Sequence, residues 1–557
     1  MLPSPLRRWP LPAFMAWIFL VLVAAASARA DTAPPPGRLV DPAWLQQRLG
    51  EVLLLDASVT PQHLAGHIPG AVSADLYRYG PGEPSRAVME QRMQSWGVSP
   101  GRAIVVYDQG GDYMAPRLFH DLYYRGVPAT DLYLLDGGLA RWRAQGGAVT
   151  KEPTPTPPPG SFRLAEPREA LRSRLPEFLV ATGDRAGHTV VDALGPEYHY
   201  GAQKFFDRAG HVPNAILMPT TDFFNPDKTF KSADEVRRLA RHAGIQPGQV
   251  VHSHCGGGVA AAVPWFALHV VAERPQVKLY LGSQHEWLRD ERGLPFWQYG
   301  EEPLRRDAAW VNGWNAPMMR MFGVAKLNIV DLRPADRYGL GHVPYALNIE
   351  AGTFRRHLGQ PDQLAAALGP AGVNPADEVV LVTDGALTPD AALAFLALEQ
   401  LGHPKVSVLM DSVDEWGLRG FELTRQPTQV GPPQSPKAMA VPAAVYPARP
   451  RAGVLVSDPA ATRGEFPKVF VALGQTAPAR APAAPATAIS LPYTGLLTAS
   501  GQPRPAAELW ALISKAGVPR QAELVLYADD VAEAAVGYYV FRLMGWRDVK
   551  VWAPAGG

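Results

Sequence analysis

The single cysteine of this 557-residue chain stands where a thiolate could act as a nucleophile. Cys255 ends the apolar run that begins at Val250, and three glycines follow it. Backbone N–H groups of such a loop, and of a helix that starts after it, can all face one sulfur atom and lower the pKa of its thiol. We therefore predict a reactive thiolate with a pKa below that of a free cysteine. The residues expected to surround the sulfur are Gly256, Gly257, Gly258, Val259 and Ala260.

Two other chemistries use similar residues. His252, His254 and Cys255 offer two nitrogens and a sulfur, a set that suits zinc or copper. In a strand, however, the two histidines share one face and the cysteine leaves on the other, so we expect no metal. A cysteine-dependent phosphatase also begins its loop with His-Cys, but it needs an arginine about six residues later to hold the phosphate, and Ala261 stands there. We expect neither a metal nor an organic cofactor.

The elements around the cysteine belong to an internal repeat. An apolar strand that ends in Asp is followed by a Gly-His-apolar-Pro turn, and this order occurs three times. The strand ends are Asp56, Asp192 and Asp331, and the turn histidines are His67, His211 and His342. We predict that these aspartates form turns or caps and that the histidines bond to the backbone.

The second half of each repeat is a helix followed by an apolar strand that leads into a turn. These strands are predicted at 103–107, 250–254, 379–383 and 524–527, with further strands at 132–135 and 406–409. Strands that alternate with helices favour an α/β fold in which each domain is a mostly parallel sheet flanked by helices. A fourth repeat keeps this half but lacks the Gly-His-Pro turn. Proline-rich linkers are predicted at 153–159 and 426–450, and a flexible loop at 477–488.

The N-terminus is typical of a secretory signal peptide. Arg7 and Arg8 precede an apolar run at 13–26, and small residues at 28–30 offer a cleavage site. We expect signal cleavage and a periplasmic protein without stable membrane insertion; retention of the segment as an anchor is the alternative. The formal net charge of +1 indicates no nucleic-acid partner.

In these features the chain resembles the rhodanese-like sulfurtransferases, α/β domains often found in tandem, in which one domain carries a catalytic cysteine and another is an inactive copy. Residues 37 to 300 look like the two-domain thiosulfate and 3-mercaptopyruvate sulfurtransferases. After the predicted signal peptide at 1–30, the resemblance implies an inactive domain at 37–150, a catalytic domain at 170–300, an inactive domain at 315–425 and a degenerate domain at 446–557.

The resemblance also implies a mechanism. Cys255 would take sulfane sulfur from a small donor, 3-mercaptopyruvate or thiosulfate, as a persulfide and pass it to cyanide or a thiol. The loop is closest to the mercaptopyruvate branch, although Gly257 and Ala260 replace residues with hydroxyl groups. Asp75 would face the loop from the inactive domain, and Arg208 would hold the anion of the donor, with Lys204 as a second candidate.

By the same resemblance, Asp108, Asp384 and Ala528 occupy the position of the cysteine in the other domains, and none of them can carry a persulfide. Those domains would be structural or would present a surface to a periplasmic protein partner. The alternative is a non-catalytic periplasmic scaffold or sulfur-carrier protein in which the cysteine loop is a relic.

Overall fold

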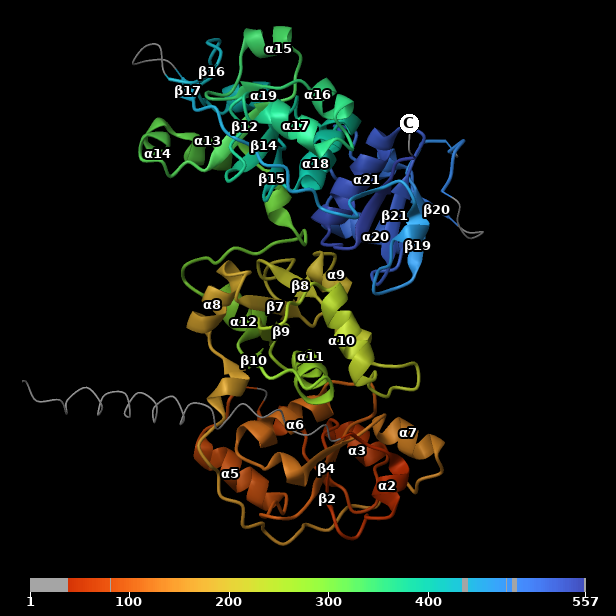
Figure 1. Ribbon diagram of the computed structural model, residues 1–557. Helices are drawn as coiled ribbons and strands as arrows, with labels where there is room; N and C mark the ends of the chain where they lie inside the picture. Colours follow the sequence, from red (N-terminus) through yellow and green to blue (C-terminus); the bar gives the residue numbers. More distant parts are fainter. Residues whose placement is uncertain (1–38, 81, 433–438, 477, 483–487, 555–557) are drawn as a thin grey trace, which may run out of the picture. The chain divides into compact units, whose positions relative to one another are not determined.

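The computed structural model describes residues 39–80, 82–432, 439–476, 478–482 and 488–554 (Figure 1). The predicted signal peptide at 1–30 and parts of the predicted loop at 477–488 lie outside these ranges. The chain divides into an N-terminal lobe, residues up to 195 with 217–237 and 245–294, and a C-terminal lobe, residues 196–216, 238–244 and 295 onward. Across the described ranges, no helix combines the length and apolar character needed to cross a membrane.

Within these residues the chain forms four five-stranded sheets and one two-stranded pair. Each large sheet has the same order: its first strand, then the fifth, fourth, second and third. The first, third and fourth sheets are parallel throughout, and in the second sheet β6, β10, β9 and β7 run parallel. The predicted fold class, tandem mostly parallel sheets flanked by helices, is confirmed.

The N-terminal lobe contains the first sheet and nearly all of the second. The strands of the first sheet are β1 (Leu39–Val40), β2 (Leu53–Asp56), β3 (Val72–Ser73), β4 (Ile104–Tyr107) and β5 (Leu132–Leu135). Its helices are α2 (Pro42–Gln46), α3 (Thr60–Ala65), α4 (Leu76–Tyr79), α5 (Arg86–Ser95), α6 (Met114–Tyr124) and α7 (Gly138–Ala144). The strands of the second sheet are β6 (Arg172–Ser173), β7 (His188–Asp192), β8 (Ala215–Leu217), β9 (Val250–His254) and β10 (Val277–Tyr280). Its helices are α8 (Leu175–Gly183), α9 (Pro196–His199), α10 (Ala233–His242), α11 (Ala262–Phe266), which continues as a π-helix over Ala267–Val271, and α12 (Ser283–Arg289).

The C-terminal lobe contains the third and fourth sheets. The strands of the third are β11 (Arg305–Arg306), β12 (Leu327–Asp331), β13 (Leu347–Asn348), β14 (Glu378–Val382) and β15 (Val406–Leu409). Its helices are α13 (Ala308–Asn315), α14 (Pro317–Met321), α15 (Ala335–Leu340), α16 (Ala351–Arg356), α17 (Pro361–Leu368), α18 (Pro389–Leu401) and α19 (Val413–Leu418). The fourth sheet has β18 (Leu455–Val456), β19 (Lys468–Ala472), β20 (Ile489–Ser490), β21 (Glu523–Tyr527) and β22 (Val549–Trp552), with helices α20 (Ala506–Lys515) and α21 (Val531–Leu543).

Two features differ from the predicted organisation. The third sheet begins with β11 at Arg305, before the predicted domain start at 315, because a two-residue edge strand leaves no apolar run in the sequence. The predicted linker at 426–450 contains a parallel strand pair, β16 (Gln429–Val430) and β17 (Ala440–Val441). The domain limits as a whole stay a prediction.

The repeated turn has one geometry in three sheets. His67, His211 and His342 are fully buried, and the Nδ1 atom of each ring bonds to a backbone carbonyl oxygen at 2.9, 2.7 and 3.0 Å, respectively. Each ring also stacks on an aromatic or imidazole ring that precedes the turn: His63, His199 or Tyr338. The structural role predicted for the three histidines is confirmed.

The aspartates at the strand ends also behave as predicted. One carboxylate oxygen of each accepts the backbone N–H two residues later, at 3.0 Å for Asp56, 3.1 Å for Asp192 and 3.0 Å for Asp331. All three side chains are fully buried, so these bonds satisfy groups that water does not reach. They fix the direction in which the chain leaves each sheet.

Each lobe is held together by one pair of apolar helices. In the N-terminal lobe α6 packs on α11, where the ring of Phe119 meets that of Phe266 at 5.0 Å. In the C-terminal lobe α18 packs on α21 (Figure 1). There the ring of Phe395 lies 4.9 Å from that of Tyr539. These are the helices that follow the second central strand of each sheet, so the loops at their starts lie close to the neighbouring sheet's domain.

Candidate active site

The cysteine loop joins β9 to α11 as the sequence predicts. Cys255 is 2% exposed, and its Sγ accepts the N–H of Gly258 at 3.1 Å. The Cys255 N–H donates to Ser283 Oγ at 3.1 Å, and that oxygen lies 4.0 Å from Sγ. Gly258 has φ +80°, and a Cβ there would stand 2.2 Å from the carbonyl oxygen of Leu281. A glycine is therefore required at this position, both for its conformation and for space.

The pKa predicted for the thiol is wrong in direction. Burial raises the pKa of Cys255, and the nearby charge of Asp192 raises it further. The N–H groups of Ala261 and Gly258 and the hydroxyl of Ser283 lower it, but they do not offset the loss of water. The loop does direct backbone N–H groups at the sulfur. Their effect is smaller than expected because the sulfur lies below the surface.

The two histidines before the cysteine are part of the core. The rings of both His252 and His254 lie against Phe178, which confirms that they share one face of β9. His252 bonds to Ser173 Oγ at 2.9 Å and to His188 Nδ1 at 3.0 Å, and burial lowers its pKa to about 3. Among the described residues, no group of three or more His, Cys, Asp or Glu side chains could hold a metal ion.

Asp75 caps a helix of the first sheet. Its Oδ1 accepts the N–H of Tyr77 at 2.9 Å, and its Oδ2 accepts the N–H and the hydroxyl of Thr60, both at 2.7 Å. These bonds anchor the carboxylate, which is 7% exposed, in the turn before α4. Its predicted role toward the cysteine loop stays a prediction.

Arg208 and Lys204 belong to the C-terminal lobe. Both side chains are exposed, and the guanidinium of Arg208 lies 5.5 Å from the centre of the Phe296 ring. Their assignment to the anion of the donor stays a prediction.

Sequence reasoning missed a buried cation beside the loop. Arg117 on α6 is fully buried, and its Nη1 donates to the carbonyl oxygen of Gly258 at 3.2 Å. Its Nε bonds to Asp121 at 3.0 Å, and its charge interacts with that of Cys255. An arginine inside the apolar helix after the first inactive loop was the available signal, because buried arginines require partners.

The inactive loop of the first sheet surrounds an acidic side chain. Asp108 follows β4 as Cys255 follows β9, and its two carboxylate oxygens accept the N–H groups of Gly110 and Ala115, both at 2.8 Å. Burial raises the pKa of Asp108 to about 7, helped by the charge of Asp112. A loop of this design can therefore direct backbone N–H donors at an acidic side chain, although burial offsets their effect on its pKa.

The strand register corrects the position predicted in the third sheet. Asp192 pairs with His254, the residue before the cysteine, and Asp331 pairs in the same way with Val382. Thr383 therefore takes the place of the cysteine, and Asp384 lies one residue later. The sequence misled because the third loop has a single glycine, Gly385, where the cysteine loop has three in a row, so its register cannot be aligned by glycines. In the fourth sheet Ala472 pairs with Tyr527, which supports Ala528 as predicted.

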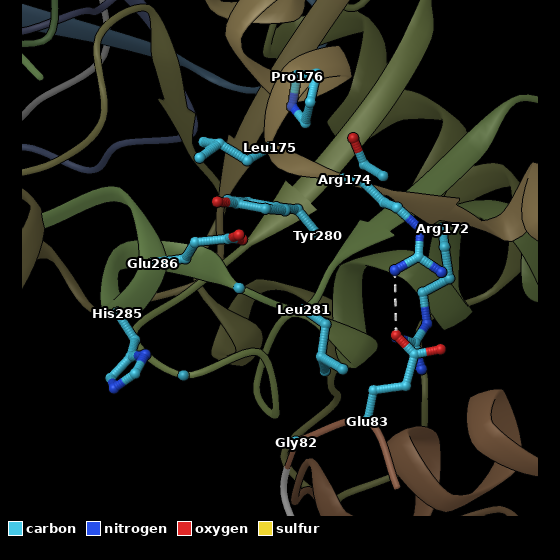
Figure 2. Close-up of a pocket in the computed structure, with 13 residues that line it drawn as sticks. Gly82, Glu83, Arg172, Arg174, Leu175, Pro176, Tyr280, Leu281, His285 and Glu286 are labelled. Atoms are coloured by element: carbon cyan, nitrogen blue, oxygen red, sulfur yellow. Dashed lines mark hydrogen bonds and ion pairs between the residues drawn. The ribbon is translucent and has the colours of Figure 1, made fainter. Parts of the chain in front are cut away.

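A cavity of about 620 Å³ opens beside the cysteine loop within the N-terminal lobe (Figure 2). Gly257 of the cysteine loop lines this cavity. The other lining residues come from the first sheet's domain and from the ends of β6 and β10, neighbouring strands at one edge of the second sheet: Gly82, Glu83, Arg172, Ser173, Arg174, Leu175, Pro176, Tyr280, Leu281, Gly282, His285 and Glu286.

Comparison with known proteins identifies the family. A sequence profile of the Rhodanese-like domain matches residues 41–145 and 317–418. The chain is 30% identical to the sulfur carrier protein TtuD of Thermus thermophilus over 272 residues, 45% of this chain and 94% of that protein. It is also 30% identical to a thiosulfate sulfurtransferase of Pseudomonas aeruginosa, over 45% of this chain and 93% of that protein. With 3-mercaptopyruvate sulfurtransferase of Escherichia coli K12 the identity is 30%, over 42% of this chain and 84% of the other.

Among solved structures, SseA from Escherichia coli matches with 27% identity and a TM-score of 0.41, over 44% of this chain and 98% of that one. The chain belongs to the rhodanese-like sulfurtransferase family.

Proposed function

We propose that this protein transfers sulfane sulfur from a small donor, 3-mercaptopyruvate or thiosulfate, to a thiol or cyanide through a persulfide on Cys255. The observation that carries the proposal is the bond from the Gly258 N–H to Sγ, in a loop whose counterpart in the first sheet holds the carboxylate of Asp108. A negative sulfur on Cys255 would receive the same kind of backbone support.

The reaction has two displacement steps. The Cys255 thiolate attacks the transferred sulfur of the donor, and a sulfur–sulfur bond forms. With thiosulfate the donor's S–S bond breaks and sulfite leaves. With 3-mercaptopyruvate the C–S bond breaks and pyruvate leaves as its enolate, which takes up the proton of the donor's thiol. The acceptor then attacks the outer sulfur of the persulfide, and Cys255 leaves as a thiolate. Loop N–H groups stabilise the anion in both steps, and the buried charge of Arg117 favours it from the side of the first sheet.

The test uses the purified chain without its signal segment. Incubation with either donor should add the mass of one sulfur atom to Cys255, and cyanide should then be converted to thiocyanate with turnover. Cys255→Ser should abolish both the added mass and the thiocyanate, because Cys255 is the one cysteine in the sequence. Turnover by the serine variant would refute the mechanism.

A sulfur carrier is the second candidate, and the name of the Thermus thermophilus relative favours it. A carrier would form the persulfide at Cys255 but release its sulfur to one protein acceptor rather than turn over with cyanide. Persulfide formation without cyanide turnover would therefore support the carrier. A relic loop in a non-catalytic scaffold would form no persulfide.

The cellular setting is also part of the proposal. The Arg7-Arg8 pair and the apolar run after it support secretion to the periplasm by a cleaved signal, and the near-neutral charge favours no nucleic-acid partner. The cysteine-free domains would serve as structure or as a surface for a periplasmic protein. Fractionation of cells that express the tagged full-length chain would test the location.

A further inference from the structure

The cysteine loop itself forms part of the wall of the cavity described above. Gly257 is two residues after Cys255, and a Cβ added to it would meet open space. The neighbouring Gly258 is the residue that bonds to Sγ. A molecule seated in the cavity therefore touches the loop that holds the sulfur. The cavity volume of about 620 Å³ is within the range of small-molecule sites, roughly 300–1,000 Å³.

One wall of the cavity is cationic. Arg172 is 5% exposed, and it pairs with Asp121 at 3.4 Å and with Glu83 at 3.7 Å. Its Nε–H has no hydrogen-bond partner among the described residues, although it is buried. Arg174 next to it is largely exposed and pairs with Glu83 at 3.3 Å. With their ion-pair partners these side chains form a cluster of four guanidinium groups and three carboxylates, which leaves one positive charge for a bound anion: Arg117, Arg125, Arg172 and Arg174 with Glu83, Asp121 and Glu169.

The opposite wall is acidic. Glu286 on α12 is exposed, and its carboxylate lies so close over Gly282 that an added Cβ would be 1.9 Å from Oε2. Figure 2 shows Glu286 beside Tyr280, across the cavity from the paired Arg172 and Glu83. Burial raises the pKa of Tyr280, and the carboxylate of Glu286 raises it further. The Glu286 carboxylate and the Tyr280 phenol therefore interact. Separated charges of opposite sign fit a zwitterion better than the anionic donors, which Glu286 would repel.

We propose that this cavity binds the sulfur acceptor, a low-molecular-mass thiol that carries both a carboxylate and an ammonium group. The carboxylate binds at Arg172 and Arg174, and the ammonium binds at Glu286. The acceptor's thiolate attacks the outer sulfur of the Cys255 persulfide, its bond to that sulfur forms, and the Cys255–sulfur bond breaks. Cys255 leaves as a thiolate and the acceptor leaves as a persulfide. The step needs no oxidant or reductant. This inference rests on the proposed function.

The experiment measures KM for three thiols with the donor held constant. L-cysteine carries both charges, N-acetyl-L-cysteine lacks the ammonium, and 2-mercaptoethanol lacks both. Glu286→Gln should raise KM for L-cysteine about three- to fivefold, as expected for the loss of one exposed charge pair, and should leave KM for the other two thiols unchanged. Glu291→Gln, which removes an exposed carboxylate just beyond α12, is the matched control and should change none of the three.

Cyanide turnover separates the two hypotheses. Wild-type turnover with cyanide supports the proposed function independently of this cavity, and the control variant Glu291→Gln should leave it unchanged. If cyanide turnover is normal but Glu286→Gln affects all three thiols equally, or none, the acceptor site is wrong and the sulfurtransferase function stands. Failure to turn over with cyanide or any thiol would overturn both. Gly257→Ala offers a second test, since its methyl group should lower the rate of sulfur transfer to L-cysteine more than the rate to cyanide.

Discussion

The pKa of Cys255 should respond in opposite directions to two substitutions that leave the sulfur in place. Burial raises this pKa, the hydroxyl of Ser283 lowers it and the charge of Asp192 raises it. Ser283→Ala removes a group that favours the thiolate, so the pKa should rise further. Asp192→Asn removes a group that opposes the thiolate, so the pKa should fall. Only an electrostatic account of the site predicts opposite signs for the two variants.

The size of each shift follows from the geometry. A hydrogen bond to a charged group contributes about 1.5–3 kcal/mol, but Ser283 Oγ lies 4.0 Å from Sγ, so about 0.7 kcal/mol is a better figure. Since 1.36 kcal/mol corresponds to one unit, the pKa should rise by about half a unit. The charge of Asp192 has the smallest of the effects on the thiol pKa. Asp192→Asn keeps an oxygen to accept the Leu194 N–H, so we expect the pKa of Cys255 to fall by at most about half a unit.

The assay is the rate of Cys255 alkylation by iodoacetamide between about pH 6 and 10.5, with unfolded protein as the reference for an ordinary thiol. Ser58→Ala is the control, because Ser58 is also fully buried but bonds to Gln109 in the first sheet. Thermal unfolding of each variant confirms that it is folded. A wild-type pKa below that of the unfolded thiol would refute the dominance of burial. Shifts of the same sign in both variants would refute the assigned causes.

Other predictions follow from the same sites. Asp108→Ala and Thr383→Ala should keep most of the sulfur-transfer activity that Cys255→Ser loses, as judged by thiocyanate formation. Because the pKa of Asp108 is raised to about 7, its favourable contribution to stability is present at low pH and is lost as pH rises through about 7. Asp108→Asn should therefore gain about 2 kcal/mol relative to wild type between about pH 5 and 8, measured by chemical unfolding. Arg117→Gln should lower kcat at least tenfold and raise the pKa of Cys255, while a double variant with Asp121→Asn reports on folding. Arg208→Ala should mainly raise KM for the donor, and an unchanged KM would remove Arg208 from the site.

The central strands of the fold could be predicted because parallel strands buried on both faces are short apolar runs between turn residues. The strands 132–135, 250–254 and 406–409 have the predicted bounds. Two-residue edge strands, such as β6 and β11, contain arginines and have no periodicity, so the sequence carries no signal for them. The start of the third sheet was missed for that reason.

The loop around Cys255 could be predicted because its glycines are local features of the sequence. The direction of the pKa shift could not, because it depends on how much water the surrounding side chains exclude. Arg117 lies far from the loop in sequence, and it meets Gly258 only through the packing of α6 on α11. Thr383 could be placed only from the pairing of β12 with β14.

The two lobes contain equivalent helix pairs, but the arginine on each pair has different partners. In the N-terminal lobe the helix pair α6 and α11 brings a buried arginine to a loop that holds a sulfur. In the C-terminal lobe the matching pair α18 and α21 carries its own buried charges, with Glu399 bonded to Tyr538 at 2.6 Å and to Arg542 at 3.2 Å. There the arginine is paired with an acid of the facing helix, and Thr383 and Ala528 stand where a thiol would be required. The arginine of that lobe therefore stabilises the helix pair, and the one cysteine of the sequence, on which the proposed sulfur chemistry depends, lies in the N-terminal lobe.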